Sequence, residues 1–185
     1  MFNLRRGAGL LAVALAITVT MTAGPAVAAS RAEINRDVDA ALAILYAKDP
    51  DARRLTSQAK AVLVFPSIVK AGFLLGAQYG DGALRAKGKT VGYYNTVAAS
   101  YGLQAGVQVF GYALFFMTDS AVQYLANSGG FELGVGPSIV VLDAGAARAF
   151  TTTTAQKDMY AIFFNQKGLM AGLGLQGSKI SRIDK

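Results

Sequence analysis

The chain has 185 residues and a formal net charge of +7, and it contains no histidine, cysteine or tryptophan. Without histidine and cysteine, most general-base, nucleophilic and transition-metal schemes lose their usual residues. The sequence also has no P-loop and no Gly-x-Ser-x-Gly motif. We therefore expect a protein that is not an enzyme and that needs neither a cofactor nor a metal ion.

The first 28 residues are typical of a secretory signal peptide. Arg5 and Arg6 form a short basic region, an apolar stretch covers residues 10–21, and Ala26-Val27-Ala28 supplies the small residues of a cleavage site. The apolar stretch is short for a membrane span of about 20 residues. We expect export to the periplasm or the extracellular space, free or peripheral on a membrane, and a single domain over residues 29–185.

The charge of the exported chain is unevenly distributed. Loss of Arg5 and Arg6 leaves 16 basic and 11 acidic residues, which is a net charge of +5. Residues 29–51 carry a net charge of −2, and the remainder carries +7. A basic body suggests an anionic partner such as membrane phosphate or nucleic acid, and export argues against nucleic acid.

Residues 30–48 are predicted to form a helix. Ser30-Arg31-Ala32-Glu33 has the pattern of a capping box, in which the first and last side chains satisfy each other's backbone amides. One apolar face follows at helical spacing, made of Ile34, Val38, Ala41, Leu42 and Leu45. Asp49-Pro50 then predicts the start of a second short helix that runs toward residue 59.

From residue 61 onward the apolar period changes to two, which predicts strands at 61–65, 72–80, 91–99, 103–109, 131–142 and 159–180. Asp81-Gly82 and Lys87-Gly88 indicate turns, and Thr118-Asp119-Ser120 caps a short internal helix. Several strands alternate glycine with large residues, and glycine in strands marks bends or close backbone approach. We expect an α+β fold: a strongly curved, mostly antiparallel sheet or small barrel-like core, with two N-terminal helices and one short internal helix.

Six blocks of sequence, in this order and spacing, resemble the SYLF domain family: residues 59–66, 68–74, 79–82, 114–122, 135–137 and 167–178. Together they extend over nearly all of residues 30–185. The resemblance implies a compact, β-rich domain with helices packed against a curved sheet. It also implies affinity for membrane phosphoinositides, as in eukaryotic members, and for actin filaments, as in yeast members.

We expect an exported lipid-binding module that binds anionic phospholipid headgroups at a membrane surface. Each basic residue near anionic lipid contributes about 1 kcal/mol. The candidate binding residues are six basic side chains from the most family-like block, the predicted hairpin turn and the flanks of the last strands: Lys70, Arg85, Lys87, Lys89, Lys167 and Lys179. Two alternatives are an envelope or secreted protein-interaction module, with a cytoskeletal partner as in the yeast relatives, and a small outer-membrane barrel.

Overall fold

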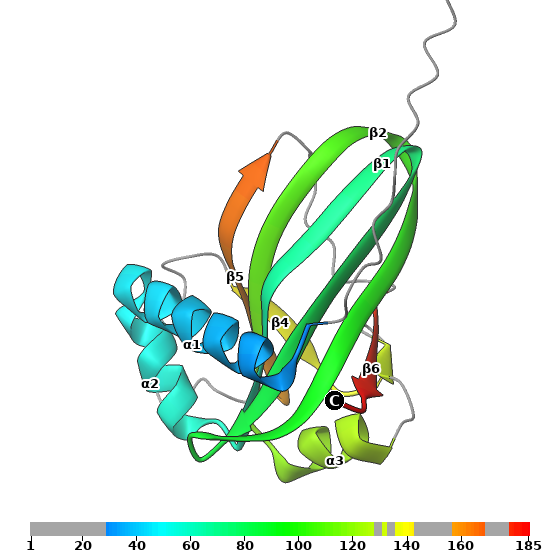
Figure 1. The fold of residues 1–185 in the computed structure, drawn as a ribbon. Coiled ribbons are helices and arrows are strands. Elements are labelled where there is room, and N and C mark those ends of the chain that lie inside the picture. Colours follow the sequence, from blue (N-terminus) through cyan, green and yellow to red (C-terminus); the bar gives the residue numbers. More distant parts are fainter. Residues whose placement is uncertain (1–28, 128–130, 133–135, 143–156, 169–177) are drawn as a thin grey trace, which may run out of the picture.

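The computed structural model describes residues 29–127, 131–132, 136–142, 157–168 and 178–185. Its elements, in chain order, are α1 (Arg31–Lys48), α2 (Pro50–Gln58), β1 (Ala61–Ala86), β2 (Lys89–Phe116), α3 (Asp119–Asn127), β3 (Phe131–Glu132), β4 (Ile139–Leu142), β5 (Met159–Gly168) and β6 (Lys179–Ile183). The α+β class, the two N-terminal helices and the short internal helix are confirmed (Figure 1). The predicted signal peptide lies outside the described residues, as do parts of the predicted strands over 131–142 and 159–180.

The capping box of α1 is present as the sequence predicts. Ser30 Oγ accepts from the Glu33 amide at 3.3 Å, and Glu33 Oε2 accepts from the Ser30 amide at 2.7 Å. These two hydrogen bonds satisfy amides that the first turn of a helix leaves without partners. The pKa of the Glu33 carboxyl lies below its ordinary value, because hydrogen bonds from the Ser30 backbone and side chain to this carboxyl favour its charged form.

A single long antiparallel hairpin, made of β1 and β2, forms the centre of the molecule. Its ladder starts at the pair Ala61 and Phe116 and ends at the turn Lys87-Gly88. Both turn residues have positive φ, 49° and 76°, as a two-residue type I′ turn requires. The predicted turn at this position is therefore confirmed, and the four short strands predicted around it are parts of two long ones.

The other predicted turn, Asp81-Gly82, is wrong, because both residues lie inside β1. A glycine is needed there for close packing, not for a turn. A Cβ at Gly82 would meet the carbonyl oxygen of Val64, and a Cβ at Gly80 would lie 2.6 Å from the carbonyl oxygen of Ser67. The second half of β1 thus packs directly against its first half.

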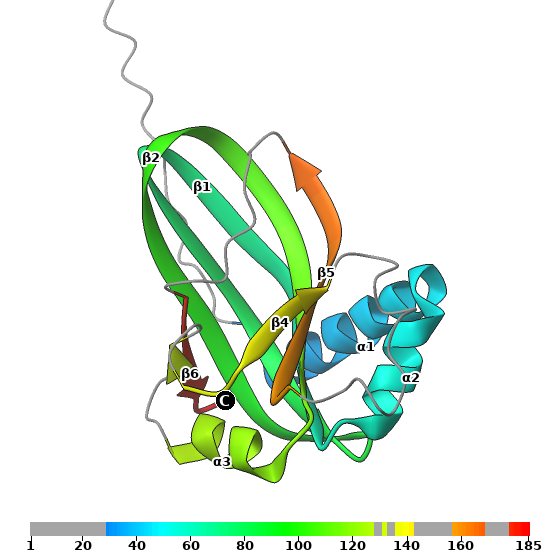
Figure 2. The same cartoon turned by 180° about the vertical axis from the view of Figure 1, so that it is seen from behind.

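The hairpin doubles over at a crease near the middle of each strand (Figures 1 and 2). In β1 the crease lies between Gly72 and Gly76, where a Cβ at Gly72 would collide with the Gly76 backbone. Two layers result. The helix-side layer contains residues 61–73 of β1, residues 105–116 of β2, β5 and β4, and the far layer contains residues 75–86 of β1, residues 89–101 of β2, β6 and β3.

The sheet is mixed but mostly antiparallel, since only β4 and β5 pair in parallel among the described strands. Strand order is β3-β6-β2-β5-β4, with β1 paired to β2. The expected strong curvature and barrel-like core are wrong, because the sheet is neither closed nor strongly curled. Its bending is concentrated at the glycine crease, so the strands between crease and turn need not coil around a barrel axis.

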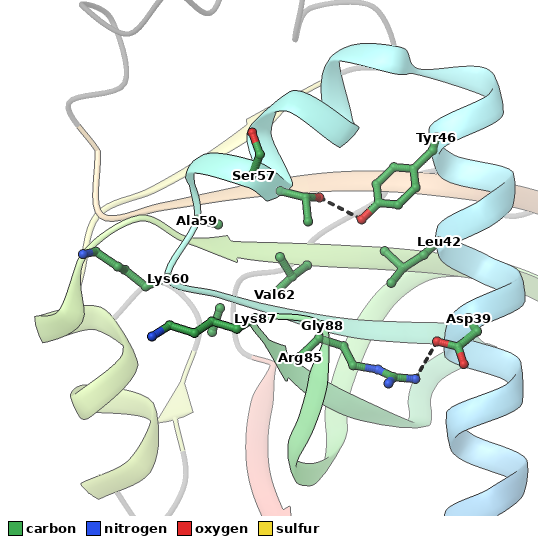
Figure 3. A pocket seen from close by; sticks show the side chains of 12 residues that line it. Asp39, Leu42, Tyr46, Ser57, Ala59, Lys60, Val62, Arg85, Lys87 and Gly88 are labelled. Atoms are coloured by element: carbon green, nitrogen blue, oxygen red, sulfur yellow. Dashed lines mark hydrogen bonds and ion pairs between the residues drawn. The ribbon is translucent and has the colours of Figure 1, made fainter.

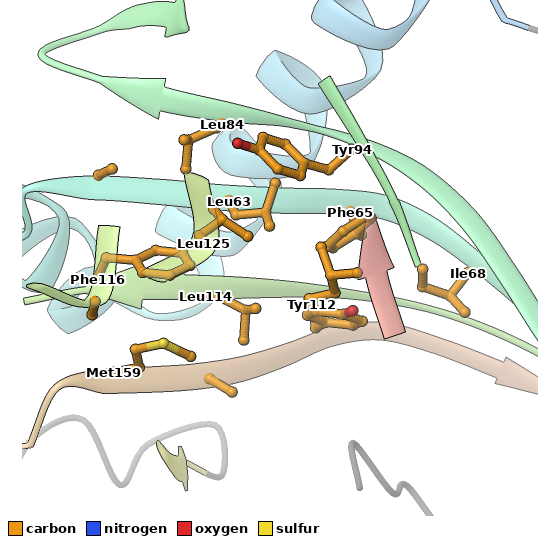
Figure 4. Packing of buried hydrophobic residues seen from close by; sticks show 14 of the residues in the cluster. Leu63, Phe65, Ile68, Leu84, Tyr94, Tyr112, Leu114, Phe116, Leu125 and Met159 are labelled. Atoms are coloured by element: carbon orange, nitrogen blue, oxygen red, sulfur yellow. The ribbon is translucent and has the colours of Figure 1, made fainter. Parts of the chain in front are cut away.

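Two apolar clusters fill the fold. The first lies between the layers and includes Phe65, Tyr112 and Phe116, closed at one end by Leu125 of α3 (Figure 4). The second lies under the helices and buries Ile34, Val38, Ala41 and Leu45 of α1 against Val64, Phe115 and Tyr160 of the helix-side layer. The predicted apolar face of α1 is therefore confirmed, except that Leu42 is only partly buried.

Candidate functional site

The structure divides the six predicted binding residues between two places. Arg85, Lys87 and Lys89 lie at the turn end of the hairpin. The other three lie nearer the crease, on β1, β5 and β6. No single surface therefore contains all six.

At the turn end, Arg85 joins the hairpin to α1. Its Nη2 donates to Asp39 Oδ1 at 2.6 Å and to the Asn35 carbonyl oxygen at 3.2 Å, and the side chain is 16% exposed. Asn35 also contacts β2, accepting from Thr90 Oγ1 at 2.7 Å and donating to the Tyr93 hydroxyl at 2.9 Å. Arg85 is thus held by protein acceptors, whereas Lys87 and Lys89 are exposed.

A cavity of about 450 Å³ opens between the two N-terminal helices and this turn (Figure 3). Two of the six predicted residues, Arg85 and Lys87, line it, and the third turn residue, Lys89, does not. Lys60, which the sequence analysis did not select, lines it too. The remaining lining residues are Asp39, Leu42, Tyr46, Thr56, Ser57, Ala59, Ala61, Val62 and Gly88.

Two cavity residues have the Ser-x-x-Lys spacing found in some serine nucleophiles, namely Ser57 and Lys60. The structure gives each a different partner. Ser57 Oγ donates to the Arg54 carbonyl oxygen at 2.7 Å, and Lys60 Nζ lies 3.4 Å from Asp119 Oδ2. A nucleophile must lie within hydrogen-bond reach of its base, and these contacts do not provide that arrangement.

The creased end of the hairpin, which we call the tip (residues 69–79 and 97–107), exposes apolar side chains. The sequence has no charged residue over 71–80 or over 96–118. Five large side chains of the tip are exposed: Val69 (48%), Leu75 (74%), Tyr79 (52%), Val97 (46%) and Val107 (57%). Contiguous exposed apolar surface usually marks a contact with a partner or a membrane.

Three of the predicted residues form a basic collar around the base of the tip: Lys70, Lys167 and Lys179. Lys70 pairs with Gln108, and Lys167 pairs with the next residue of β2, Val109. Because neighbouring residues of a strand point to opposite faces, these two lysines lie on opposite faces of the helix-side layer. Lys179 pairs with Val97 in the far layer. Lys167 and Lys179 are exposed and Lys70 is half-buried.

The acidic group nearest the tip in β1, Asp81, is neutralised locally. It accepts from the Tyr79 hydroxyl at 2.6 Å and pairs with Lys185 Nζ at 3.4 Å. The hydrogen bond to Asp81, more than burial, raises the pKa of Tyr79 to about 12, so this side chain is neutral at physiological pH. A neutral tyrosine suits the boundary between an apolar and an aqueous phase.

None of the helices in the described ranges is long and apolar enough to cross a membrane. The same ranges contain no group of three or more Cys, Asp or Glu side chains that could hold a metal ion.

The tip was missed by the sequence analysis. Its signal was available in the two long stretches without charge, but the alternation of glycine with large residues was interpreted as the mark of a strongly curved sheet or small barrel.

Comparison with known proteins gives one family. No curated protein matches the chain. A family model, Ysc84, described as Las17-binding protein actin regulator, matches residues 97–185, which begin in the tip and include α3 and β3 to β6. The family consists of binding modules, not enzymes, and has lipid-binding and actin-binding members. Residues 97–185 of the chain therefore match the Ysc84 family, the SYLF family that its sequence motifs resemble.

Proposed function

We propose that this protein is a non-catalytic module that binds the surface of an anionic membrane by inserting its tip between the lipid headgroups. One observation carries the proposal: an apolar tip, whose single charged residue is Lys70 at its base, is bordered on both layers by exposed lysines, Lys167 and Lys179. Such an arrangement places apolar side chains among acyl chains while the lysines contact phosphate groups.

The size of the tip agrees with insertion into one leaflet. Phe73 at the crease lies four positions along the strand from Val69, which is at the level of Lys167. At about 3.3 Å per residue, the tip extends about 13 Å beyond its collar. Half of the hydrocarbon core is about 15 Å, so the tip does not reach the midplane of the bilayer.

The sheet edges also favour shallow insertion. In the described part of the chain β1 pairs only with β2, so its other edge has backbone groups outside the ladder. Such an edge cannot lie across the hydrocarbon core without a cost of several kcal/mol per unsatisfied group. We therefore propose peripheral binding, with the tip in the headgroup region and the upper acyl chains.

The lysine charges make a moderate, salt-dependent contribution to the affinity for an anionic membrane. Lys167 and Lys179 together contribute at most about 2 kcal/mol near anionic lipid, or about thirtyfold in affinity. Screening over about 8 Å at physiological salt reduces this, and we expect about tenfold.

We also propose that the protein is exported after cleavage near Ala28, which would bring the tip to an envelope membrane rather than to the cytoplasm.

The test is cosedimentation of residues 29–185 with vesicles of phosphatidylglycerol and phosphatidylcholine, compared with phosphatidylcholine alone. Leu75 is 74% exposed, and burying a whole leucine side chain contributes about 1.5–3 kcal/mol. Leu75→Asp should therefore weaken binding by at least about five- to thirtyfold. The matched control is Val91→Asp, because Val91 is 51% exposed on the same hairpin but lies near the turn.

The lysines are tested in the same assay. Lys167→Gln with Lys179→Gln should weaken binding about tenfold, while Arg36→Gln with Lys157→Gln, an equal loss of exposed charge outside the tip, should have a smaller effect. Equal effects of Leu75→Asp and Val91→Asp would overturn insertion of the tip. If only Lys87→Gln with Lys89→Gln weakens binding, the turn end contacts the membrane instead. Failure to bind either vesicle would refute the proposal and favour the tip as a docking surface for a protein partner.

A further inference from the structure

We infer that the cavity beside the hairpin turn binds a single-chain anionic amphiphile, a molecule with one alkyl chain and one acidic group. The hairpin turn that lines the cavity lies at the opposite end of the hairpin from the crease (Figures 1 and 2). Both ends of β1, Ala61 and Arg85, line it, whereas the crease lies in the middle of β1. The inference is therefore independent of membrane insertion by the tip.

Positive charge gathers at one end of the cavity. Figure 3 shows the side chains of Lys60 and Lys87 at the same end, with the ion pair of Arg85 and Asp39 at the other. The lining thus contains three cations and one acid. Lys60 lies 3.4 Å from Asp119, and Lys87 has no ion-pair partner within the described residues. The acidic group of a bound ligand would form an ion pair with Lys87.

The middle of the cavity is apolar. Val62 lies between the cationic end and the ion pair, and Leu42 lies beside the ion pair (Figure 3). Ala61 also lines the cavity. The hydroxyl of Tyr46 is hydrogen-bonded to Thr56 Oγ1 at 2.9 Å, so this polar pair is satisfied. Ligand cavities of about 300–1,000 Å³ are usually apolar with a few converging polar groups, and this one has that character. A free phosphate ion would use the charges but leave the apolar surface in contact with water.

The first test is calorimetric titration of residues 29–185 with dodecanoate below its micelle concentration. Dodecyl phosphate, dodecanol and inorganic phosphate are titrated in parallel. We expect dodecanoate and dodecyl phosphate to bind. Dodecanol and inorganic phosphate should bind at least about tenfold more weakly, because dodecanol lacks the acidic group and inorganic phosphate lacks the alkyl chain. Inorganic phosphate binding as tightly as dodecanoate would overturn the apolar part of the inference, and dodecanol binding as tightly would overturn the ionic part.

Two variants locate the ligand. Lys87→Gln should weaken dodecanoate binding about tenfold, whereas Lys89→Gln, an exposed lysine of the same turn outside the cavity, should change it less than about twofold. Ser57→Trp adds a large side chain at an exposed lining position and should abolish binding without changing the charge. The inference fails if Lys87→Gln and Lys89→Gln have equal effects, or if a folded Ser57→Trp protein still binds.

The cavity and the tip can be tested separately in the same preparations. Leu75→Asp should leave the affinity for dodecanoate unchanged, and Ser57→Trp should leave vesicle binding unchanged. Loss of dodecanoate binding in the tip variant would show that the ligand occupies the tip rather than the cavity, which would overturn the inference.

Discussion

Replacement of Leu45 by alanine tests whether α1 packs on the sheet as the structure shows. Leu45 is 2% exposed and belongs to the same buried cluster as Phe115 and Tyr160. Leucine-to-alanine changes in cores cost about 2–5 kcal/mol, and the cost is highest where the neighbours cannot collapse into the cavity. The neighbours here include large rings on a sheet, so we expect about 3–4 kcal/mol. For a chain of this size the melting temperature should then fall by about 6–16 °C.

Urea unfolding of residues 29–185, followed by circular dichroism, measures this change. Ile44→Ala is the control, because the adjacent residue is 39% exposed and surface changes usually cost within about 0.5 kcal/mol. Equal effects of the two variants would refute the docking of α1. They would also remove the basis for the cavity, whose wall includes Leu42 and Tyr46 of the same helix.

Three further predictions concern separate features. Gly80→Ala should destabilise the fold by about 1–3 kcal/mol, because the new Cβ would lie 2.6 Å from the Ser67 carbonyl oxygen; an unchanged urea midpoint would contradict the packing of the two halves of β1. Asp81→Asn should lower the pKa of Tyr79 from about 12 toward 10, measured by NMR with labelled tyrosine. The hydrogen bond between Tyr79 and Asp81 stabilises the folded state fully below about pH 10, and this stabilisation is lost as the pH rises through about 12. N-terminal sequencing of the exported protein should begin at or near Ala29, and an intact Met1 would contradict export by cleavage.

The sequence by itself determined the elements whose signals are local. The capping box at Ser30 and the helical spacing from Ile34 to Leu45 predict α1 and its buried face, because capping and amphipathicity depend on residues within a few positions of each other. The turn at Lys87-Gly88 could also be predicted, because the type of a hairpin turn depends on the few residues that form it. The basic residues and the turn cluster of Arg85, Lys87 and Lys89 were also identifiable from the sequence, but the grouping of the other three lysines into a collar was not.

Only the tertiary structure decided what the glycines do. Asp81-Gly82 has the composition of a turn, yet Gly82 lies inside β1 because its missing side chain leaves room for the Val64 backbone. The crease near Gly72 doubles the hairpin, so residues far apart in sequence, such as Lys167 and Lys179, border one tip. The cavity arises in the same way, from two helices and both ends of one strand. Such contacts between distant segments leave no periodic signal in the sequence, because they depend on where the chain bends and not on its local pattern.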